Sequence, residues 1–374
     1  EDPIDPLATE ASAAQNNLNG TNTAISQQEQ NDLNKASKTL DDLHKTEDTT
    51  ADVGTAPTTS SASQAATTNT AAKASWTLDG LNNATWYENI GKGQFPVYAR
   101  AHVMLNNSHA SPGAIDGTSG KNTLKAIASF QQMNGISPTG ILTKETWDAL
   151  VARQGSRPAF IEYTVTEADL KGPYAKSIPH DYAEQAKMKG LYYTRVSEML
   201  GEKFHMDELF LQKINSGASF NKVGEKIIVA NVKNTLPKNI KMIIAHKGSK
   251  QLYLLDQQNK MIASFPATIG SEDNPSPSGT HVIGSIVPNP HYSYNPKNFI
   301  QGKNLKPLSL PPGPNNPVGN IWIGLSRPSF GIHGTPNPTL ISKTASHGCI
   351  RLTNWDANNL SKIVRKGMTV RFLE

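Results

Sequence analysis

The chain of 374 residues holds a single cysteine, Cys349, and no long apolar segment. A lone cysteine has no disulfide partner within the chain, so the cross-links that stabilise many small secreted domains are excluded. Because no run of about 18 apolar residues is present, the sequence predicts no membrane-spanning helix. The chain also lacks an arginine-rich helix, zinc-finger spacing and an RNA-binding aromatic strand, which argues against nucleic acid as the partner.

Aromatic residues are absent from residues 1–75, which are rich in Ala, Thr, Ser, Asn and Gln, as in the stretch TSSASQAATTNTAAKAS. Such a composition buries too little apolar surface to offset the entropy lost on folding. We therefore expect a disordered, low-complexity tether over 1–75. A short amphipathic helix around Leu33 and Leu40 is the one exception that the pattern allows.

Charge is distributed unevenly along the chain. Residues 1–75 carry 11 acidic and 4 basic side chains, whereas residues 238–374 carry 15 basic and 5 acidic ones. A basic C-terminal part favours an anionic partner, such as a membrane surface or a cell-wall polymer.

Three helical patterns lie between Val97 and Leu150, joined by the turn-rich stretches DGTSG at 116–120 and NGISPTG at 134–140. They predict a small three-helix domain at 76–155. The segment resembles the type 1 peptidoglycan-binding domain, which implies binding to cell-wall glycopeptide. The resemblance rests on Asp116, Gly117, Gly120, Thr123, Ala126, Ile127, Phe130, Gln131, Gly135, Gly140, Thr146, Trp147 and Leu150.

The next segment, 156–236, has strand patterns near both ends, FIEYTV at 160–165 and KVGEKIIVANV at 222–232. Two short helical patterns lie between them, the second introduced by Asp207. This β-α-α-β order resembles a LysM domain, which implies glycan binding. Residues 166–194 depart from that family, in which the first strand passes almost directly into the first helix, so a mere spacer is the alternative.

From residue 237 onward, short apolar or alternating runs are separated by turns, as in KQLYLLD at 250–256. This pattern predicts a mostly β domain over 237–374. One helix is expected after Thr353, because Thr353 and Asp356 have the spacing of a helix cap. The aperiodic stretch 287–319 predicts a long loop or lid.

Cys349 lies in the stretch SHGCIRL at 346–352, 16 residues after His333. A thiol is only a few per cent ionised near neutral pH, so a catalytic cysteine needs a base or a positive neighbour. His333 follows a predicted strand and supplies either one, provided that the fold brings the two segments together. Gly348 permits a tight turn, and backbone N–H groups around Gly348 and Cys349, next to a helix start, would bind a developing oxyanion.

Two other interpretations of these residues stay open at this point. In the first interpretation, Cys349 is a small apolar side chain buried in the core. In the second interpretation, zinc is bound by His333, His347 and Cys349. A zinc site needs a fourth ligand or an open position, and no nearby Asp, Glu or Cys has ligand-like spacing. We therefore expect no metal and no cofactor.

Three sequence blocks resemble the signature of the L,D-transpeptidase family. They are PSPSGTHVIG at 275–284, GIHGTPNP at 331–338 and SHGCIRL at 346–352, in order within 238–374. The resemblance implies a β-sandwich or barrel with one or two helices. It also implies an exported enzyme of the periplasm or cell wall, acting on peptidoglycan without a cofactor and inhibited by carbapenem lactams. We expect a monomer.

The resemblance also implies roles for individual residues. Cys349 would be the nucleophile and His333 its base, the carbonyl of Gly334 would orient the imidazole, and His347 would line the site. Gly348 completes the catalytic candidates.

Further residues are candidates for binding the substrate. Arg351 offers a planar fork for a carboxylate. Ser346 is expected to be a structural hydrogen-bonding residue rather than a second nucleophile, and Trp322 lies either in the core or in the cleft. The complete set of these candidates is Arg351, Ser346, Thr335, Tyr292, Tyr294 and Trp322.

The implied reaction joins two stem peptides of peptidoglycan. The thiolate would attack the third residue of a donor tetrapeptide, release the terminal D-Ala and form a thioester, which an amine of a second stem peptide resolves as a 3→3 cross-link. If water resolved the thioester instead, the enzyme would be a carboxypeptidase or endopeptidase. If a protein lysine resolved it, the enzyme would attach a protein to the cell wall. A non-catalytic wall-binding scaffold is the alternative outside the enzymes.

Overall fold

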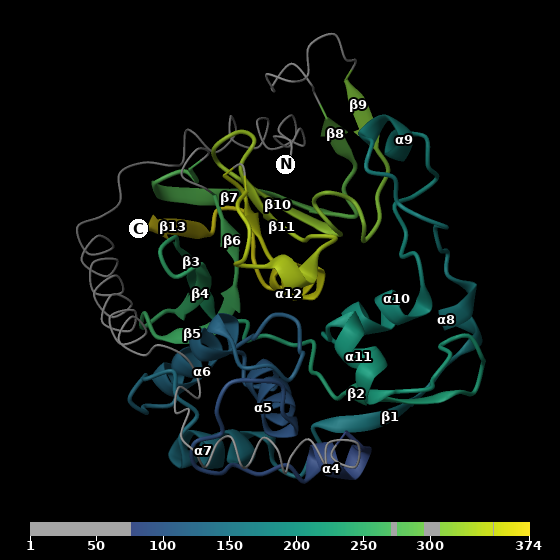
Figure 1. Cartoon of the computed structure of the whole chain (residues 1–374). Helices are drawn as coiled ribbons and strands as arrows, with labels where there is room; N and C mark the ends of the chain where they lie inside the picture. Colours follow the sequence, from purple (N-terminus) through teal and green to yellow (C-terminus); the bar gives the residue numbers. More distant parts are fainter. Residues whose placement is uncertain (1–75, 271–274, 295–306, 347) are drawn as a thin grey trace. The chain divides into compact units, whose positions relative to one another are not determined.

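The computed structural model describes residues 76–270, 275–294, 307–346 and 348–374 (Figure 1). The expected tether at 1–75 and His347 lie outside the described residues. Within them the chain forms two compact units. We call residues 76–172 with Val196–Asn234 the helical unit, and Pro173–Arg195 with Thr235–Glu374 the sheet unit.

The helical unit contains the three helices, the two strands and the two helices between those strands that the sequence predicts, and it adds a short helix before them and another after the first strand. Local capping explains two helix starts, since Thr143 accepts a hydrogen bond from the Thr146 N–H and Asp207 accepts one from the Phe210 N–H. Its elements are α4 (Leu78–Asn82), α5 (Pro96–Asn107), α6 (Lys121–Met133), α7 (Lys144–Gln154), β1 (Phe160–Thr164), α8 (Glu167–Lys171), α10 (Val196–Lys203), α11 (Glu208–Ile214) and β2 (Lys226–Ala230). None of the helices in the described part of the chain is long and apolar enough to cross a membrane.

Residues of both expected modules, 76–155 and 156–236, contribute to one hydrophobic cluster, and the three helices have a second cluster of their own. The Ile115 N–H donates to the His205 carbonyl at 2.8 Å, and the Asp207 N–H donates to the Ile115 carbonyl at 2.9 Å. The ring of Phe210 lies 3.3 Å from where a side chain on Gly117 would begin, so the glycine makes room for it. The turn at Gly117 and α11 therefore pack together within the helical unit.

The segment that departs from the LysM pattern is divided between the units. Thr166 and Asp169 form a complete capping box for α8 within the helical unit. Pro173–Arg195, which we call the arm, instead belongs to the sheet unit and carries α9 (Tyr182–Ala186). The Ala175 N–H donates to the Tyr193 carbonyl at 2.9 Å, which ties the two ends of the arm together.

The sheet unit is built on nine strands in the order β5-β4-β3-β13-β7-β10-β11-β12-β6. β5 and β6 occupy opposite edges of this order, yet only Ala267 separates them in the chain. The sheet must therefore curl back on itself, which confirms a mostly β, barrel-like domain. The strands are β3 (Ile240–His246), β4 (Gln251–Asp256), β5 (Met261–Pro266), β6 (Thr268–Ile269), β7 (Gly279–Pro288), β10 (Ile321–Leu325), β11 (Gly331–His333), β12 (Ile350–Arg351) and β13 (Thr369–Leu373).

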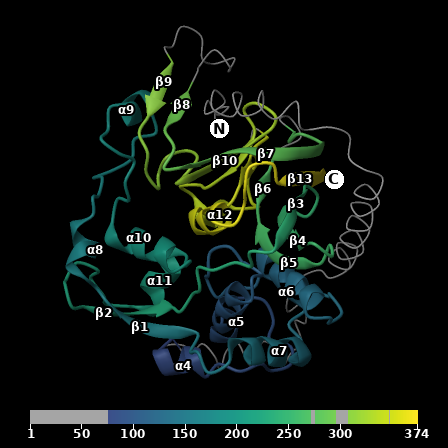
Figure 2. The ribbon, with the colours of Figure 1, turned by 180° about the vertical axis from the view of Figure 1, so that it is seen from behind.

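Three smaller elements complete the sheet unit. The helix expected after Thr353 is α12 (Asn354–Ser361), and Thr353 caps it by accepting from the Asp356 N–H. A short 3-10 helix spans Pro338–Leu340. β8 (Tyr292–Tyr294) and β9 (Leu308–Leu310) form a two-stranded ladder at the stretch expected to be a loop, and α9 of the arm lies beside it in both views (Figures 1 and 2).

Candidate active site

Two short parallel strands bring the cysteine and histidine segments together. β11 pairs with β12 so that Ile332 lies opposite Ile350 and His333 lies opposite Arg351. Cys349 immediately precedes β12, and side chains two residues apart on a strand share a face. The pairing therefore places Cys349 just before β12 and His333 at the end of the adjacent strand β11, two positions further along the ladder.

His333 is a buried imidazole with one nitrogen fixed. Its Nδ1 lies 2.6 Å from the Gly334 carbonyl oxygen. A carbonyl only accepts, so Nδ1 carries the proton and Nε2 is the basic nitrogen of the neutral ring. Burial lowers the pKa of His333 to about 4, although the Gly334 hydrogen bond opposes this. Of the two roles expected for His333, the structure favours a neutral base over a positively charged neighbour.

Trp322 is the cross-strand neighbour of His333 and covers it. The two rings stack with centroids 5.8 Å apart and planes 23° apart. Trp322 is 0% exposed, which confirms the core alternative for this residue. Among the described residues no acceptor bonds its Nε1. The indole excludes water from the imidazole and thereby contributes to the low pKa.

The thiol of Cys349 is partly buried and unpaired with any other cysteine. Its Sγ donates to the Ser329 carbonyl at 3.4 Å. The side chain packs against an apolar cluster whose buried members are Leu191, Tyr292, Leu310, Val318 and Trp322. Partial exposure fits a thiol that a substrate reaches better than it fits a sealed core cysteine.

Ser346 fixes the loop that carries Cys349. Its hydroxyl donates to the Cys349 carbonyl at 2.7 Å and accepts from the N–H of Gly270 at 2.8 Å and of Gly348 at 3.3 Å. These contacts support the structural role expected for Ser346. They also occupy the Gly348 N–H that the sequence analysis offered to an oxyanion, and α12 begins only beyond β12, so that expectation is not supported for Gly348.

Gly348 is required by its conformation and by its surroundings. Its φ of +113° is a value that side-chain-bearing residues rarely adopt. A Cβ there would also collide with the ring of Phe330. The Gly348 carbonyl accepts a hydrogen bond from the Ser276 hydroxyl at 2.7 Å. Phe330 and Ser276 were not among the candidate site residues, although Ser276 lies within the signature block at 275–284.

Asn354 is a further residue that the sequence analysis did not identify. Its Oδ1 accepts from the N–H groups of Asn320 and Thr335, both at 3.2 Å, and its Nδ2 donates to the Pro314 carbonyl at 3.2 Å. A Cβ on Gly334 would collide with Oδ1. Asn354 thus anchors the turn whose carbonyl orients His333. A polar residue directly after the Thr353 cap was the only available signal.

The remaining substrate-binding candidates are largely engaged within the protein. Thr335 is buried, and its hydroxyl accepts from the Asn337 N–H at 3.1 Å. Arg351 donates to the Ala345 carbonyl at 3.3 Å, and burial lowers its pKa to about 10. Tyr292 is 1% exposed and meets Tyr182 of the arm edge to face.

Two candidate residues lie wholly or partly outside the described part of the chain. The side chain of Tyr294 and the whole of His347 lie outside the described residues. Among the residues that the structure does describe, no group of three or more His, Cys, Asp or Glu side chains could hold a metal ion.

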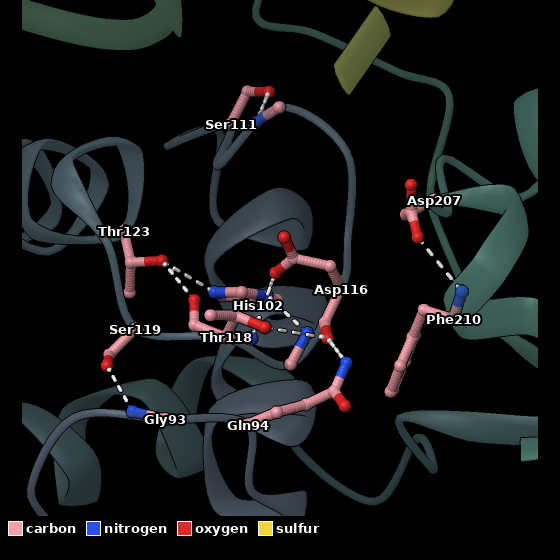
Figure 3. Close-up of polar contacts among 12 residues, drawn as sticks. Gly93, Gln94, His102, Ser111, Asp116, Thr118, Ser119, Thr123, Asp207 and Phe210 are labelled. Carbon is pink, nitrogen blue, oxygen red and sulfur yellow. Dashed lines mark hydrogen bonds and ion pairs between the residues drawn. The ribbon is translucent and has the colours of Figure 1, made fainter. Parts of the chain in front are cut away.

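The helical unit has a buried polar network at the turn that begins with Asp116 (Figure 3). Nε2 of His102 lies 2.8 Å from the Thr123 hydroxyl, which itself donates to the Thr118 carbonyl at 3.0 Å. Nδ1 of His102 accepts from the Gly117 N–H at 3.2 Å, and burial lowers the His102 pKa. A neutral His102 therefore ties α5 to the turn and to the start of α6.

A thiol and a neutral, oriented imidazole, here carried by adjacent segments of the sheet, are the groups that nucleophilic acyl transfer uses. Comparison with known families identifies the chain more closely. Residues 240–371 match the profile described as "L,D-transpeptidase catalytic domain", and residues 101–150 match "Putative peptidoglycan binding domain". The C-terminal part of the chain therefore contains a domain that matches the L,D-transpeptidase catalytic domain.

Curated relatives support this assignment. The protein named "Putative L,D-transpeptidase YkuD" of Bacillus licheniformis is 29% identical over 175 residues, which cover 46% of this chain and 90% of that protein. The protein of the same name in Bacillus subtilis is 29% identical over 149 residues, covering 39% of this chain and 74% of that protein.

Two solved structures are distant matches. An L,D-transpeptidase (Yku) from Stackebrandtia nassauensis has 16% identity and a TM-score of 0.29, covering 78% of this chain and 96% of that one. L,D-transpeptidase 3 from Mycobacterium tuberculosis, in complex with a faropenem-derived adduct, has 16% identity and a TM-score of 0.30. This chain spans 60% of the length of the latter and the match covers 36% of this chain.

Proposed function

We propose that the chain is a peptidoglycan L,D-transpeptidase that works through a thioester on Cys349. The observation that carries the proposal is the fixed tautomer of His333, whose Nδ1 proton is held by Gly334 and whose Nε2 is left to accept a proton beside the strand end that carries Cys349. A neutral base is the form that activates a thiol without prior ionisation.

The first half-reaction forms the thioester. The Cys349 proton passes to His333 Nε2 as sulfur bonds to the carbonyl carbon of the third residue of a donor tetrapeptide. The bond from that carbon to the nitrogen of the terminal D-Ala breaks, and the imidazolium returns its proton to the departing amine.

The second half-reaction resolves the thioester. An amine of a second stem peptide attacks the same carbon and His333 accepts a proton from that amine. The carbon–sulfur bond breaks to give a 3→3 cross-link, and the imidazolium returns the proton to the departing sulfur. Water or a protein lysine would follow the same route, so these acceptors are the alternatives for the second step.

The helical unit is proposed to hold the enzyme on its polymeric substrate. Residues 101–150 match a peptidoglycan-binding family, and this supports action outside the cytoplasm on the wall. The β-α-α-β part at 160–230 is proposed to be a LysM-like contributor to glycan binding. It shares its core with the matched segment, which favours a single binding unit over two independent ones.

Product analysis tests the proposed reaction. Peptidoglycan fragments rich in tetrapeptides are incubated with the full chain, and the products are separated and weighed by mass spectrometry. We expect cross-linked dimers with one D-Ala released for each link, and no products with Cys349→Ser, because a hydroxyl is far less acidic than a thiol. Trimmed monomers without dimers would establish the hydrolase instead, and unchanged products with Cys349→Ser would overturn the proposal.

A further inference from the structure

The arm joins the active site although it lies within the sequence of the helical unit. We propose that Pro173–Arg195 is a positioning element, which holds the His333 turn in place through the 312–315 turn and Asn354. This inference rests on the proposed role of His333 as the base. Two independent sets of contacts support it, one apolar and one made of hydrogen bonds.

The apolar contacts close the cluster around Cys349. Leu191 of the arm is 0% exposed and belongs to the same cluster as Trp322, the residue that stacks on His333. Four more arm residues pack against that cluster: Ile178, Tyr182, Ala186 and Met188. Without the arm, Tyr292 and Trp322 would lose this cover, and an apolar patch beside the thiol would face water.

The hydrogen bonds clamp the arm to one turn of the sheet unit. The Leu191 N–H donates to the Pro312 carbonyl, and its own carbonyl accepts from the Asn315 N–H, both at 2.9 Å. The Asn315 side chain donates to the Tyr192 carbonyl at 2.9 Å. A Cβ on Gly313 would collide with the Leu191 carbonyl, so the backbones approach as closely as glycine allows.

The clamped turn continues to the base through Asn354. Pro314, within the turn, accepts from Asn354 Nδ2, while Asn354 Oδ1 accepts from the Thr335 N–H. Thr335 follows Gly334, whose carbonyl orients His333. The arm is therefore connected to the imidazole by consecutive hydrogen bonds and backbone steps, besides the packing of Leu191 near Trp322.

The position of the arm in the chain determines how the active site is connected to the helical unit. Both of its ends continue directly into the helical unit, at Gly172 and at Val196. The chain of the unit proposed to bind the wall thus leads, at both ends, into a segment of the sheet unit that supports the catalytic base. A protein cut at residue 235 would lose that support together with the wall-binding unit.

Point variants of the full chain test the inference. Leu191→Ala removes the packing, Leu191→Met preserves the volume, and Lys189→Ala changes an exposed arm residue as a control. The readout is the rate at which imipenem acylates Cys349, followed by intact mass between pH 5 and 9. The ionisable groups on the segment next to His333 are Arg351, directly opposite it on β12, and Cys349, which precedes β12.

We expect Leu191→Ala to slow acylation at pH 7 by about tenfold, a fraction of what a general base contributes. We also expect its rate to rise with pH toward the ordinary thiol pKa of about 8.5, whereas the wild type reaches a plateau at lower pH. Leu191→Met and Lys189→Ala should stay within about twofold of the wild type, since neither removes the packing volume. A loss of rate with an unchanged pH profile would overturn the positioning role.

A double-mutant cycle tests the hydrogen-bonded route. Asn315→Ala removes the side-chain bond to Tyr192 and is mild, while Asn354→Asp keeps the acceptor for Thr335 but loses the donor to Pro314. If both act along one route, the double variant should be no slower than Asn354→Asp alone. If the two substitutions slowed acylation by factors that multiply in the double variant, the hydrogen-bonded route would be overturned. A wild-type acylation rate in Asn315→Ala would overturn it as well. Failure of wild-type Cys349 to react with imipenem would instead count against the proposed function.

Discussion

The buried neutral state of His333 predicts how the stability of the sheet unit depends on pH. The pKa of His333 is lowered to about 4 in the folded protein, against an ordinary value of 6.5. The unfolded chain therefore binds a proton between these values while the folded chain does not. Stability from this group is fully present above pH 6.5 and is lost as the pH falls from 6.5 toward 4.

The size of the loss follows from the two pKa values. One pKa unit corresponds to about 1.4 kcal/mol, so acidification from pH 7 to pH 4 should cost the wild type about 3 kcal/mol through His333. Most of this arises from the burial that Trp322 and its neighbours impose, because desolvation disfavours the charged ring. His333→Gln removes the titrating group while keeping a polar side chain of similar size.

The assay is urea unfolding of the wild type and His333→Gln at several pH values between 4 and 7.5. The difference in unfolding free energy between the two proteins should fall by about 3 kcal/mol toward acid pH. His205, whose pKa is also lowered to about 4 by burial, contributes equally to both proteins and cancels in the difference. A difference that does not change with pH would refute the assignment of a buried neutral His333.

Three further predictions concern single contacts. Gly348→Ala should lower the free energy of unfolding by about 2 kcal/mol through the strained backbone conformation at this position alone. Adding Phe330→Ala should remove the steric collision but leave the backbone strain, and melting curves of both variants will show this. Ser346→Ala should slow acylation of Cys349 by about tenfold with little change in the substrate KM, because it loosens the loop without touching the substrate; an unchanged rate would remove its positioning role. His102→Ala should destabilise the helical unit by about 2 kcal/mol and weaken pelleting with cell-wall sacculi near the melting temperature, yet leave imipenem acylation unchanged. A matching loss of acylation would contradict the separate behaviour of the two units.

Features set by neighbouring residues could be predicted from the sequence. The helix caps at Thr143, Asp207 and Thr353 are local, since each side chain bonds an N–H three residues on. The strand before His333 followed from its apolar residues, whereas its pairing with the cysteine segment was left open by the sequence.

Features that depend on distant contacts could not be predicted. Leu191 lies in an aperiodic stretch, and its partners are more than a hundred residues away in sequence. Asn354 serves three backbone segments that only the fold assembles. The shared core of the helical unit depends on Phe210 meeting Gly117, and neither residue shows this in its own neighbourhood.

The low pKa of His333 was also beyond the sequence, because burial alone sets it. A histidine near a cysteine is compatible with both a neutral base and an ion pair. Only the burial under Trp322 favours the neutral form, since the bond to Gly334 acts in the opposite direction on the pKa.

The central claim is that Cys349 carries the acyl group, and trapping that intermediate tests it most directly. The full chain is treated with imipenem or with a donor tetrapeptide, quenched in acid and digested, and the modified peptide is sequenced by mass spectrometry. Cys349 is the only cysteine in the chain, so Cys349→Ala leaves no thiol at all. We predict one adduct, on Cys349 of the wild type, and none on Cys349→Ala. An adduct on the neighbouring Ser346, or one that persists in Cys349→Ala, would contradict the account.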